Sequence, residues 1–538
     1  MKQLLLYLFL SLLATACYDD LGNYKYTDLN NVTVDSIHSN QWYEKYTYAD
    51  TLRIEPVLSL ALGGTEDHLE FEWKLMPLHA RYNNDSIPVE EQKAGYIIGR
   101  EKNLAYPLKE KPGEYAGFFY VKDTQTGISY KTDFYVRLRT AVSEGWMVLC
   151  EEAGKARLDM ISYTSANEKL ISHNLWKNLD FDLGKPHKLV YNYNRTLGTS
   201  RLVYCDAGTF NLDPETLQPS EENNMRWQFS ENPDKVEIVG GATTMNSGTR
   251  RELVVTSEGE LYWRKYDDIA TGAQFTFPVN KLKNSNEFFK VSPHIGYKPH
   301  YNWEVCSIIL YDESNRRFLA LESAIESEDR WGNITYKAQD YPNVLSFSEG
   351  GTANYDANTG KDLVHMEGTR EGYVFAVLKT PGTEDYDIYG MITQDEWEVV
   401  RTHQIRLLPA NSEKITLFAF HPIFRFLFYA TDQGNVYQFD FSKPGTPAQK
   451  ILSFPGEHIS VMKFQCPVAY VTYEPWETER EYWLYISGYD TTQEESVSGV
   501  FRMYDFPAQT SAPVLKQEIY HLGKIVDIAY RYKNDYKK

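Results

Sequence analysis

Three oxygen-bearing side chains lie close together in residues 356–362 (DANTGKD). Asp356, Asn358 and Asp362 offer the carboxylate and amide oxygens that hard cations such as calcium prefer. The segment lacks the third acidic position and the distal Glu of an EF-hand, and a plain Asn-x-Gly turn explains the same residues. We therefore expect no resident cofactor, and a calcium ion at these three residues is the one metal that the sequence suggests.

Catalytic motifs are missing from the chain. It contains no GxSxG elbow, HExxH helix, phosphate loop, dinucleotide fingerprint or zinc ribbon at the required spacing. A glycoside hydrolase needs only two carboxylates about 5–9 Å apart, and spacing in the sequence cannot single out such a pair. We expect no catalytic residue and no enzymatic activity. The alternative is a surface glycoside hydrolase that uses carboxylates at the centre of its main domain.

Aromatic side chains in long predicted loops are the better candidates for binding. Tyr301 and Trp303 precede a predicted strand, Trp331 follows another, and Trp476 lies in the insertion EPWETEREYW. Flat aromatic faces pack against sugar rings and peptide side chains, and exposed Trp and Tyr are typical recognition anchors. Aromatic residues also fill cores, so the same four residues can serve packing instead. They are the predicted binding residues for a glycan or a peptide.

The N-terminal segment predicts export and a lipid anchor. Residues 1–16 contain one Lys, an apolar run over 4–13 and small residues directly before Cys17. The run is about half of the ~20 residues that span a bilayer, so it indicates a signal peptide. The small residues ending in Ala-Cys resemble the bacterial lipobox, although Ala replaces the usual Leu, and ordinary cleavage near Ala16 is the alternative. We predict a lipidated, palmitate-bearing Cys17 and an acidic tether over 17–30.

Charge and aromatic content narrow the class of the protein. The chain of 538 residues has 74 Asp and Glu against 55 Lys and Arg, which gives a net charge of −19. No basic surplus is present to neutralise phosphates, so we expect no nucleic-acid partner. The 41 Tyr, 26 Phe and 11 Trp favour half-buried pleated surfaces. The expected fold class is all-β.

Residues 31–141 predict a first domain. Between 51 and 140 the sequence alternates strand-like runs with turns, and a hairpin is expected around 123–127. The length and spacing match an immunoglobulin-like sandwich, with Trp73 on a central strand and a corner at 113–115. The cysteine pair of true immunoglobulin domains is missing.

Residues 142–538 contain a longer repeat. Strand segments of similar character begin near seven positions, namely Trp146, Arg201, Glu252, Val305, Tyr373, Arg425 and Tyr482. A repeat of ~40–50 residues with about four short strands is the signature of a β-propeller. We predict seven blades, of which residues 414–454 form the clearest. The first blade lacks an upstream strand, and residues 525–532 supply one, so the ring is predicted to close between its two ends.

Strand order predicts how the loops are distributed. The connections 296–304, 323–332 and 466–481 are predicted to open on one face, and the first domain, which acts as a spacer, is predicted to enter on that face at 142–145. The long connections 339–360 and 488–498 open on the opposite face. We expect the aromatic loops to face the first domain and any membrane partner, with a ligand held between the domains as the alternative, and the opposite face to be free for nutrient.

Three motifs resemble one known family. Residues 17–26 (CYDDLGNYKY) look like the C-x-D-D-x-G-N-Y-x-Y opening of PKD-like family lipoproteins, and the hairpin at 121–127 and the stretch 145–162 resemble later regions of that family. Family members are typically encoded beside a TonB-dependent transporter and its substrate-capturing lipoprotein, in Sus-type uptake systems. The resemblance implies a PKD-like sandwich and an accessory role in nutrient import. It implies no catalytic residues.

These observations lead to one predicted function. The chain is expected to be an outer-membrane lipoprotein on the cell exterior that acts as an accessory binding or scaffold component of a TonB-dependent uptake complex. Its expected partners are the transporter, the substrate-capturing lipoprotein, a glycan or peptide ligand and, through the lipid anchor, the outer membrane.

Overall fold

The protein is built almost entirely of β-strands. The structure is a computed structural model that describes residues 29–532, apart from 38–41, 48–49, 79–94, 141, 164–168, 193–198, 245–250, 266–271, 284, 299–307, 329–333, 348–354, 370–371, 394–398, 465–478 and 507–511. Two compact units, Met1–Arg139 and Thr140–Lys538, divide the chain. Within the described residues, no helix has the length and apolar character needed to cross a membrane.

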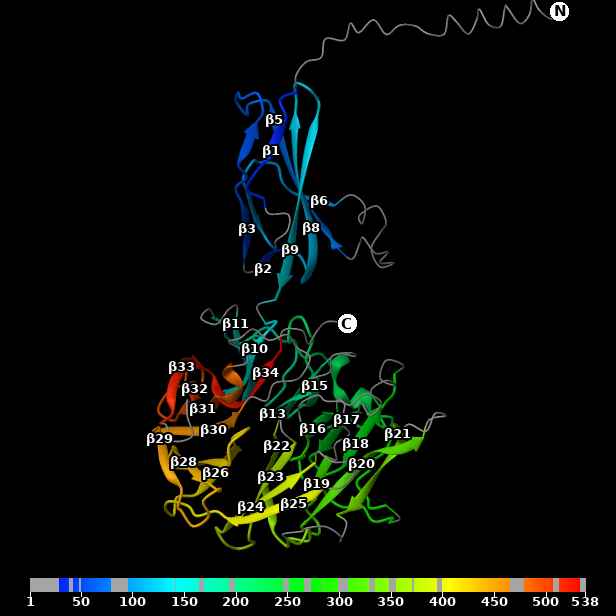
Figure 1. Cartoon of the computed structure of the whole chain (residues 1–538), viewed down its shortest axis with the longest axis vertical. Coiled ribbons are helices and arrows are strands. Elements are labelled where there is room, and N and C mark those ends of the chain that lie inside the picture. The colour runs from blue at the N-terminus through cyan, green and yellow to red at the C-terminus, as the bar shows by residue number, and fades with distance from the viewer. Residues whose placement is uncertain are drawn as a thin grey trace, which may run out of the picture. The chain divides into compact units, whose positions relative to one another are not determined.

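The first unit is a β-sandwich (Figure 1). Its strands are β1 (Val32–Val34), β2 (Trp42–Tyr46), β3 (Thr51–Ile54), β4 (Leu58–Leu60), β5 (Leu69–Pro77), β6 (Tyr96–Gly99), β7 (Leu104–Pro107), β8 (Gly113–Asp123) and β9 (Ser129–Arg139). The larger sheet has the order β2-β9-β8-β5-β6, and the pairs β1-β4 and β3-β7 share one apolar core with it.

Trp73, on β5, lies at the centre of this core, as the sequence predicted. It is fully buried, and its ring stacks on Phe119 with centroids 4.1 Å apart. Its indole N–H donates to the carbonyl of Glu101 at 2.8 Å, so the polar edge of the ring is satisfied. The Tyr115 hydroxyl donates to the carbonyl of Lys111 at 2.7 Å. This bond is the tyrosine corner found in immunoglobulin-like sandwiches.

The second unit contains seven sheets among the described residues, arranged around a common centre in Figure 1. In chain order they are the first, β10 (Gly145–Glu152), β11 (Lys155–Tyr163), β12 (Lys169–Ser172) and β34 (Lys524–Arg531); the second, β13 (Pro186–Asn192), β14 (Ser200–Cys205) and β15 (Gly208–Asn211); the third, β16 (Ile238–Thr244), β17 (Arg251–Thr256) and β18 (Leu261–Lys265); the fourth, β19 (Ile308–Asp312), β20 (Arg317–Glu328) and β21 (Ile334–Ser346); the fifth, β22 (Asp362–Gly368), β23 (Tyr373–Lys379), β24 (Tyr386–Ile392) and β25 (Val400–Arg406); the sixth, β26 (Ile415–Phe420), β27 (Phe426–Thr431), β28 (Asn435–Asp440) and β29 (Gln449–Ser453); and the seventh, β30 (Glu457–Phe464), β31 (Leu484–Asp490), β32 (Gly499–Asp505) and β33 (Val514–Leu522). Short 3-10 turns lie at η2 (Glu221–Asn223), η3 (Met225–Gln228) and η4 (Arg480–Tyr482).

Each sheet packs face to face on the next through an apolar cluster that the two share. On β17, Leu253 and Val255 belong to the cluster with the fourth sheet, while Val254 belongs to the cluster with the second. Successive side chains of a strand point to opposite faces, so one apolar run serves two neighbours. A further cluster, containing Trp146 and Tyr485, joins the seventh sheet to the first. The unit is therefore propeller-like.

The last strand of the chain completes the first sheet. β34 pairs antiparallel with β10, from Gly145 opposite Arg531 to Glu151 opposite Lys524. Beside this pairing, the buried Asp159 carboxylate accepts from the Arg157 guanidinium at 2.7 Å and from the backbone N–H of Gly523 at 2.9 Å. The two ends of the unit are thus joined by backbone, ionic and apolar contacts.

A β-bulge recurs in the strands nearest the centre. In six strands the pairing skips one residue within the first few residues of the strand. These skips lie in β13 at 186/188, β16 at 238/240, β22 at 363/365, β26 at 415/417, β30 at 459/461 and β34 at 525/527. A bulge bends its strand and re-aims the side chain that follows it. Lys188, His365 and Asp527 each follow such a bulge. The repeated irregularity therefore decides which side chains face the centre.

The sixth sheet matches its sequence prediction closely. Strands β26 to β29 occupy the predicted blade at 414–454. Gly434 in the turn between β27 and β28 has φ 71°, and a Cβ there would lie 2.4 Å from the Phe454 carbonyl. Both the left-handed backbone and the close approach require glycine.

Candidate functional site

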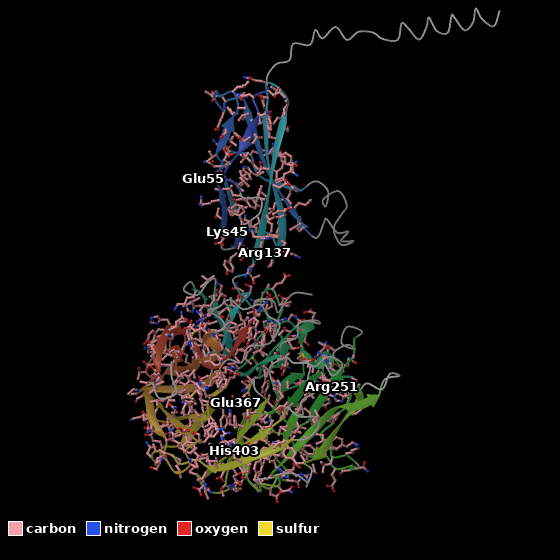
Figure 2. The ribbon with its side chains drawn as sticks, viewed as in Figure 1. Lys45, Glu55, Arg137, Arg251, Glu367 and His403 are labelled. Carbon is pink, nitrogen blue, oxygen red and sulfur yellow. The ribbon has the colours of Figure 1, made fainter. Side chains whose placement is uncertain are left out.

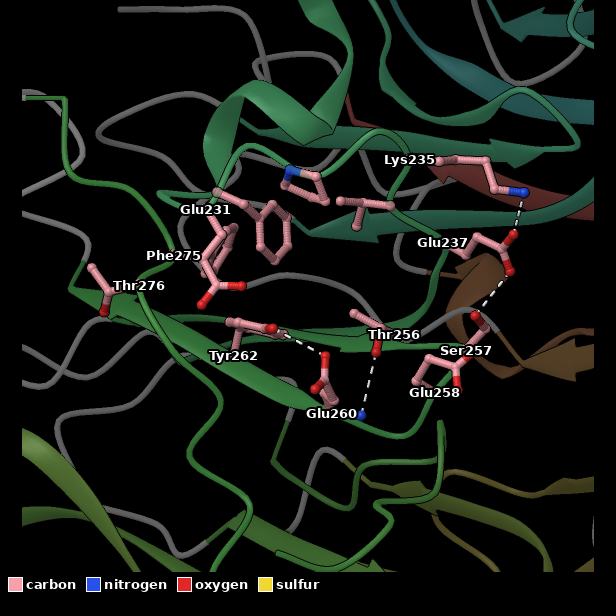
Figure 3. A pocket seen from close by; sticks show the side chains of 13 residues that line it. Glu231, Lys235, Glu237, Thr256, Ser257, Glu258, Glu260, Tyr262, Phe275 and Thr276 are labelled. Carbon is pink, nitrogen blue, oxygen red and sulfur yellow. Dashed lines mark hydrogen bonds and ion pairs between the residues drawn. The ribbon is translucent and has the colours of Figure 1, made fainter.

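The clearest hollow lies where the second and third sheets meet. These sheets have three strands each in the described part of the chain, and beside the outer strand of the second sheet Phe210 forms an isolated bridge to Asn224. A cavity of about 340 Å³ opens there, lined by residues of 229–237, 256–262 and 275–276. We call it the side hollow; Figure 3 shows it from close by. Its volume lies within the range of ligand-binding clefts.

Aromatic rings form the apolar wall of the side hollow. Phe229 and Phe275 are buried, with ring centroids 5.0 Å apart, and the Tyr262 ring lies edge-on to Phe229 at 4.9 Å. The Arg264 guanidinium covers the Phe275 ring at 4.4 Å. The three rings are thus fixed by one another and by an arginine before any ligand arrives.

Carboxylates and hydroxyls form the rim. The Glu237 carboxylate binds the Lys235 ammonium and accepts from the hydroxyls of Tyr204 at 2.7 Å and Ser257 at 2.8 Å. These donors, Lys235 first, lower the pKa of Glu237 to about 2. The Tyr262 hydroxyl donates to Glu260 at 3.0 Å. Figure 3 shows the contacts of Glu237 with Lys235 and Ser257, and the contact of Tyr262 with Glu260.

Two further carboxylates on the rim have no hydrogen-bond or ion-pair partner in the described part of the chain. Glu231 and Glu258 line the cavity and are exposed. Among the described residues, neither makes a hydrogen bond or an ion pair. Their negative charges are therefore available to a bound molecule.

A second hollow lies near the centre of the unit. A cavity of about 470 Å³ is lined by residues of 187–191, 239–241 and 293–295, with Tyr204 and Met366. We call it the axial hollow. It opens where β13 and β16 begin and β14 ends, and the side hollow opens where β16 begins and β17 ends. Both therefore lie at the same end of the antiparallel strands.

A charged cluster stands behind the axial hollow. Asp527 is nearly buried, 3.7 Å from the ammonium groups of both Lys188 and Lys463, and accepts from the Leu189 N–H at 3.0 Å. Burial raises the pKa of Asp527, but the two ammonium groups and the backbone donors outweigh burial, so the pKa is lowered. The ion pair links the first, second and seventh sheets.

Histidines and a second carboxylate complete the central cluster. The rings of His294 and His365 lie 5.5 Å apart, and burial, followed by the neighbouring His365 and Lys188, lowers the pKa of His294 to about 3. Glu367 lies near the middle of the unit in Figure 2 and accepts from the N–H of Phe420. In the described part of the chain, no three His, Cys, Asp or Glu side chains are arranged to hold a metal.

The calcium candidates make local contacts. Asp356 accepts from the backbone N–H of Asn358 at 2.9 Å, as in an Asx turn. The Asp362 carboxylate pairs with the Arg316 guanidinium at 2.8 Å. The loop is thus held by protein donors, and a calcium ion at these residues stays a prediction.

The other predicted site residues lie outside the described residues. They are Cys17, Tyr301, Trp303, Trp331 and Trp476. Sequence reasoning missed both hollows. The one usable signal was the spacing of the second and third repeats, in which no clear fourth strand follows GTFNLD or GELYWRKYD.

Comparisons with known proteins agree with this architecture over part of the chain. A model of the PKD-like family matches residues 17–180, so the first unit is PKD-like and the match runs into the first sheet of the second unit. No curated protein matches the chain.

Similar solved structures are distant. A quinonprotein alcohol dehydrogenase-like protein from Bacteroides thetaiotaomicron is 10% identical, covers 93% of this chain and 99% of its own, and has a TM-score of 0.39. Apo AztD from Citrobacter koseri is 11% identical, with coverage of 86% and 98% and a TM-score of 0.31. YCF48 from Cyanidioschyzon merolae is 10% identical, with coverage of 64% and 95% and a TM-score of 0.29. Likenesses at this level carry no argument about function.

Proposed function

We propose that this protein is a surface-exposed outer-membrane lipoprotein that binds nutrient as an accessory component of a TonB-dependent, Sus-type uptake complex. In this proposal the second unit is a seven-bladed propeller closed by β34. The single observation that carries a binding role is the side hollow, which combines a preformed aromatic wall with two carboxylates that have no partner among the residues that the structure describes. The ligand is a glycan or a peptide.

The lipid anchor is tested by removing it. The motif before Cys17 supports lipidation, and within the described residues no helix is long and apolar enough to cross a membrane. Cys17→Ala should move the protein from the membrane fraction to the soluble fraction and abolish palmitate labelling. Retention of the variant in membranes after a high-salt wash would count against lipid anchoring.

The partnership is tested by co-purification. The tagged wild-type protein, extracted in detergent at native expression, should bring down a TonB-dependent transporter and its substrate-capturing lipoprotein. A monomeric, partner-free preparation would argue against the accessory role. The predicted loop residues Trp303, Trp331 and Trp476 are the first to replace together by Ala, because they are the proposed contacts with protein.

The alternative function is a surface glycoside hydrolase. The observation in its favour is that two carboxylates, Glu367 and Asp527, lie on strands near the centre of the unit. Asp527 keeps its charge through its ion pairs and so suits a nucleophile or base, whereas a general acid needs a raised pKa. Turnover of a glycan panel that is lost in Glu367→Gln would favour the hydrolase over the binding protein.

A further inference from the structure

The two hollows adjoin through one hydrogen bond. The Tyr204 hydroxyl donates to Glu237 at 2.7 Å; Tyr204 lines the axial hollow and Glu237 lines the side hollow. Both hollows open at the same end of the strands. A ligand that occupied both hollows would therefore lie across Tyr204 and Glu237.

The side hollow is suited to a positive group. Four glutamates line it against one lysine, and that lysine is already bound to Glu237. Glu231 and Glu258 remain without a partner among the described residues, and the neighbouring Tyr262 and Phe229 rings add an apolar wall. An alkylammonium group combines the charge and the apolar stem that such a lining attracts.

The axial hollow has the opposite character. No Asp or Glu lines it, and its charged residue is Lys188. The Lys188 side chain is 50% exposed, whereas its carboxylate neighbour Asp527 is 10% exposed. At 3.7 Å their contact is longer than a hydrogen bond, so the ammonium keeps donors for a ligand. A molecule in this hollow meets the lysine rather than the carboxylate, in a chain whose net charge is −19.

We propose that the side and axial hollows form one site for a short peptide with free termini, whose amino end lies beside Glu231 and Glu258 and whose carboxylate lies beside Lys188. This inference rests on the proposed binding function and chooses peptide over glycan. A neutral glycan offers neither charge, and an acidic sugar offers only one. The two ends of a peptide match two hollows of opposite character.

The test uses the full chain carrying Cys17→Ala, so that the protein is soluble, and isothermal titration with four probes. These are tetraalanine, its N-acetyl form, its C-terminal amide and the neutral sugar maltotetraose. We expect tetraalanine to bind, and each blocked form to bind roughly fivefold more weakly, the loss expected for one partly exposed ion pair. Maltotetraose should not compete.

Variants assign each end of the peptide. In E231Q/E258Q, free and acetylated tetraalanine should bind alike, while the penalty of the amide persists; in K188Q the reverse should hold. E287Q and K450Q change exposed residues that do not line either hollow and should leave all affinities unchanged. Thermal unfolding of each variant checks that it is folded.

Other outcomes overturn the inference. Equal binding of free and blocked peptides, or a uniform loss in every variant, would show that the termini are not read. Binding of maltotetraose without tetraalanine would reject the peptide and leave the proposed nutrient-binding function standing. Binding of neither probe overturns the peptide site, whereas failure of the proposed function as a whole would appear separately as loss of the transporter in co-purification.

Discussion

The seventh and first sheets meet differently from the second and third. The contact between the seventh and first sheets, here called the closing joint, is formed by two four-stranded sheets. In it, Trp146 packs against Tyr485 and Tyr530, with ring centroids 4.4 Å and 5.3 Å apart. The contact between the second and third sheets, here called the open joint, lies between sheets of three described strands each. The side hollow lies at this contact. The same repeating architecture thus makes a filled contact where the two ends of the second unit pair, and a cavity between two sheets of three described strands.

The charges follow the same division. At the closing joint, Asp159 and Arg157 are buried and bound to each other. At the open joint, Glu231 and Glu258 are exposed and have no partner among the described residues. A buried charge without a partner has a large desolvation free energy, whereas an exposed charge stays hydrated and can remain unpaired until a ligand binds. Pairing therefore separates groups that hold the fold from groups that can bind.

The strongest test of this contrast is Trp146→Ala. The ring is almost fully buried between two sheets, so its removal should lower the free energy of unfolding of the second unit by ~3–5 kcal/mol. Trp227→Ala is the matched control, because Trp227 is 40% exposed and should change stability little. Denaturant unfolding monitored by circular dichroism gives both values, and equal effects would remove the distinction.

The second test addresses the buried charge at the closing joint. Asp159→Asn keeps the volume of the side chain but removes the buried one of the two carboxylates that pair with the Arg157 guanidinium, and Glu152 remains at 2.9 Å. We expect a loss of roughly 1.5–3 kcal/mol, the usual worth of hydrogen bonds to a charged group. Lys155→Ala, which removes the exposed pair with Asp182, is the control and should have no measurable effect.

Phe229→Ala probes the open joint and should cost less than Trp146→Ala. Phe229 is buried, yet its ring borders a cavity that is open to solvent. The variant loses the transfer free energy of the ring but leaves no sealed void, so we expect about 2 kcal/mol. A loss as large as that for Trp146 would indicate that the side hollow closes in solution.

Much of the fold could be predicted from the sequence because alternating apolar runs carry it. Strands β26 to β29 were predictable since each run is short, apolar and followed by a turn, with Gly434 between the central pair. Trp73 was predictable as core for the same reason. The pairing of β34 with β10 was predictable from counting strands. The first predicted blade lacked an upstream strand, and the C-terminal segment offered a strand that belonged to no other blade.

The hollows could not be predicted in the same way. Their residues come from segments far apart in the chain. The cavities are the space between neighbouring sheets that the connecting segments do not occupy. The bulge before Lys188 also directs this side chain toward the centre. The position of a bulge cannot be read from the alternation of apolar and polar residues in the sequence. Aromatic loop residues were the visible candidates because Trp and Tyr stand out by type alone, whereas Glu231 and Glu258 are two of 74 acidic residues.

The smallest expected effect concerns the hydrogen bonds that join the two hollows. The pKa of Glu237 is about 2 rather than 4.5, because of Lys235 first and then the hydroxyls of Tyr204 and Ser257. Since the folded pKa is the lower one, this carboxylate stabilises the fold above about pH 4.5, and its contribution is lost as the pH falls toward 2.

Ser257→Ala and Tyr204→Phe should each raise the pKa of Glu237 toward 4.5, because each removes one donor to the charged form. Carboxyl-detected NMR titration measures this directly. Ser230→Ala is the control, since the Ser230 hydroxyl donates to the carbonyl of Thr276 instead. An unchanged pKa in Tyr204→Phe would mean that Tyr204 does not bridge the axial and side hollows. The contact that joins the linings of the two hollows would then be absent in solution.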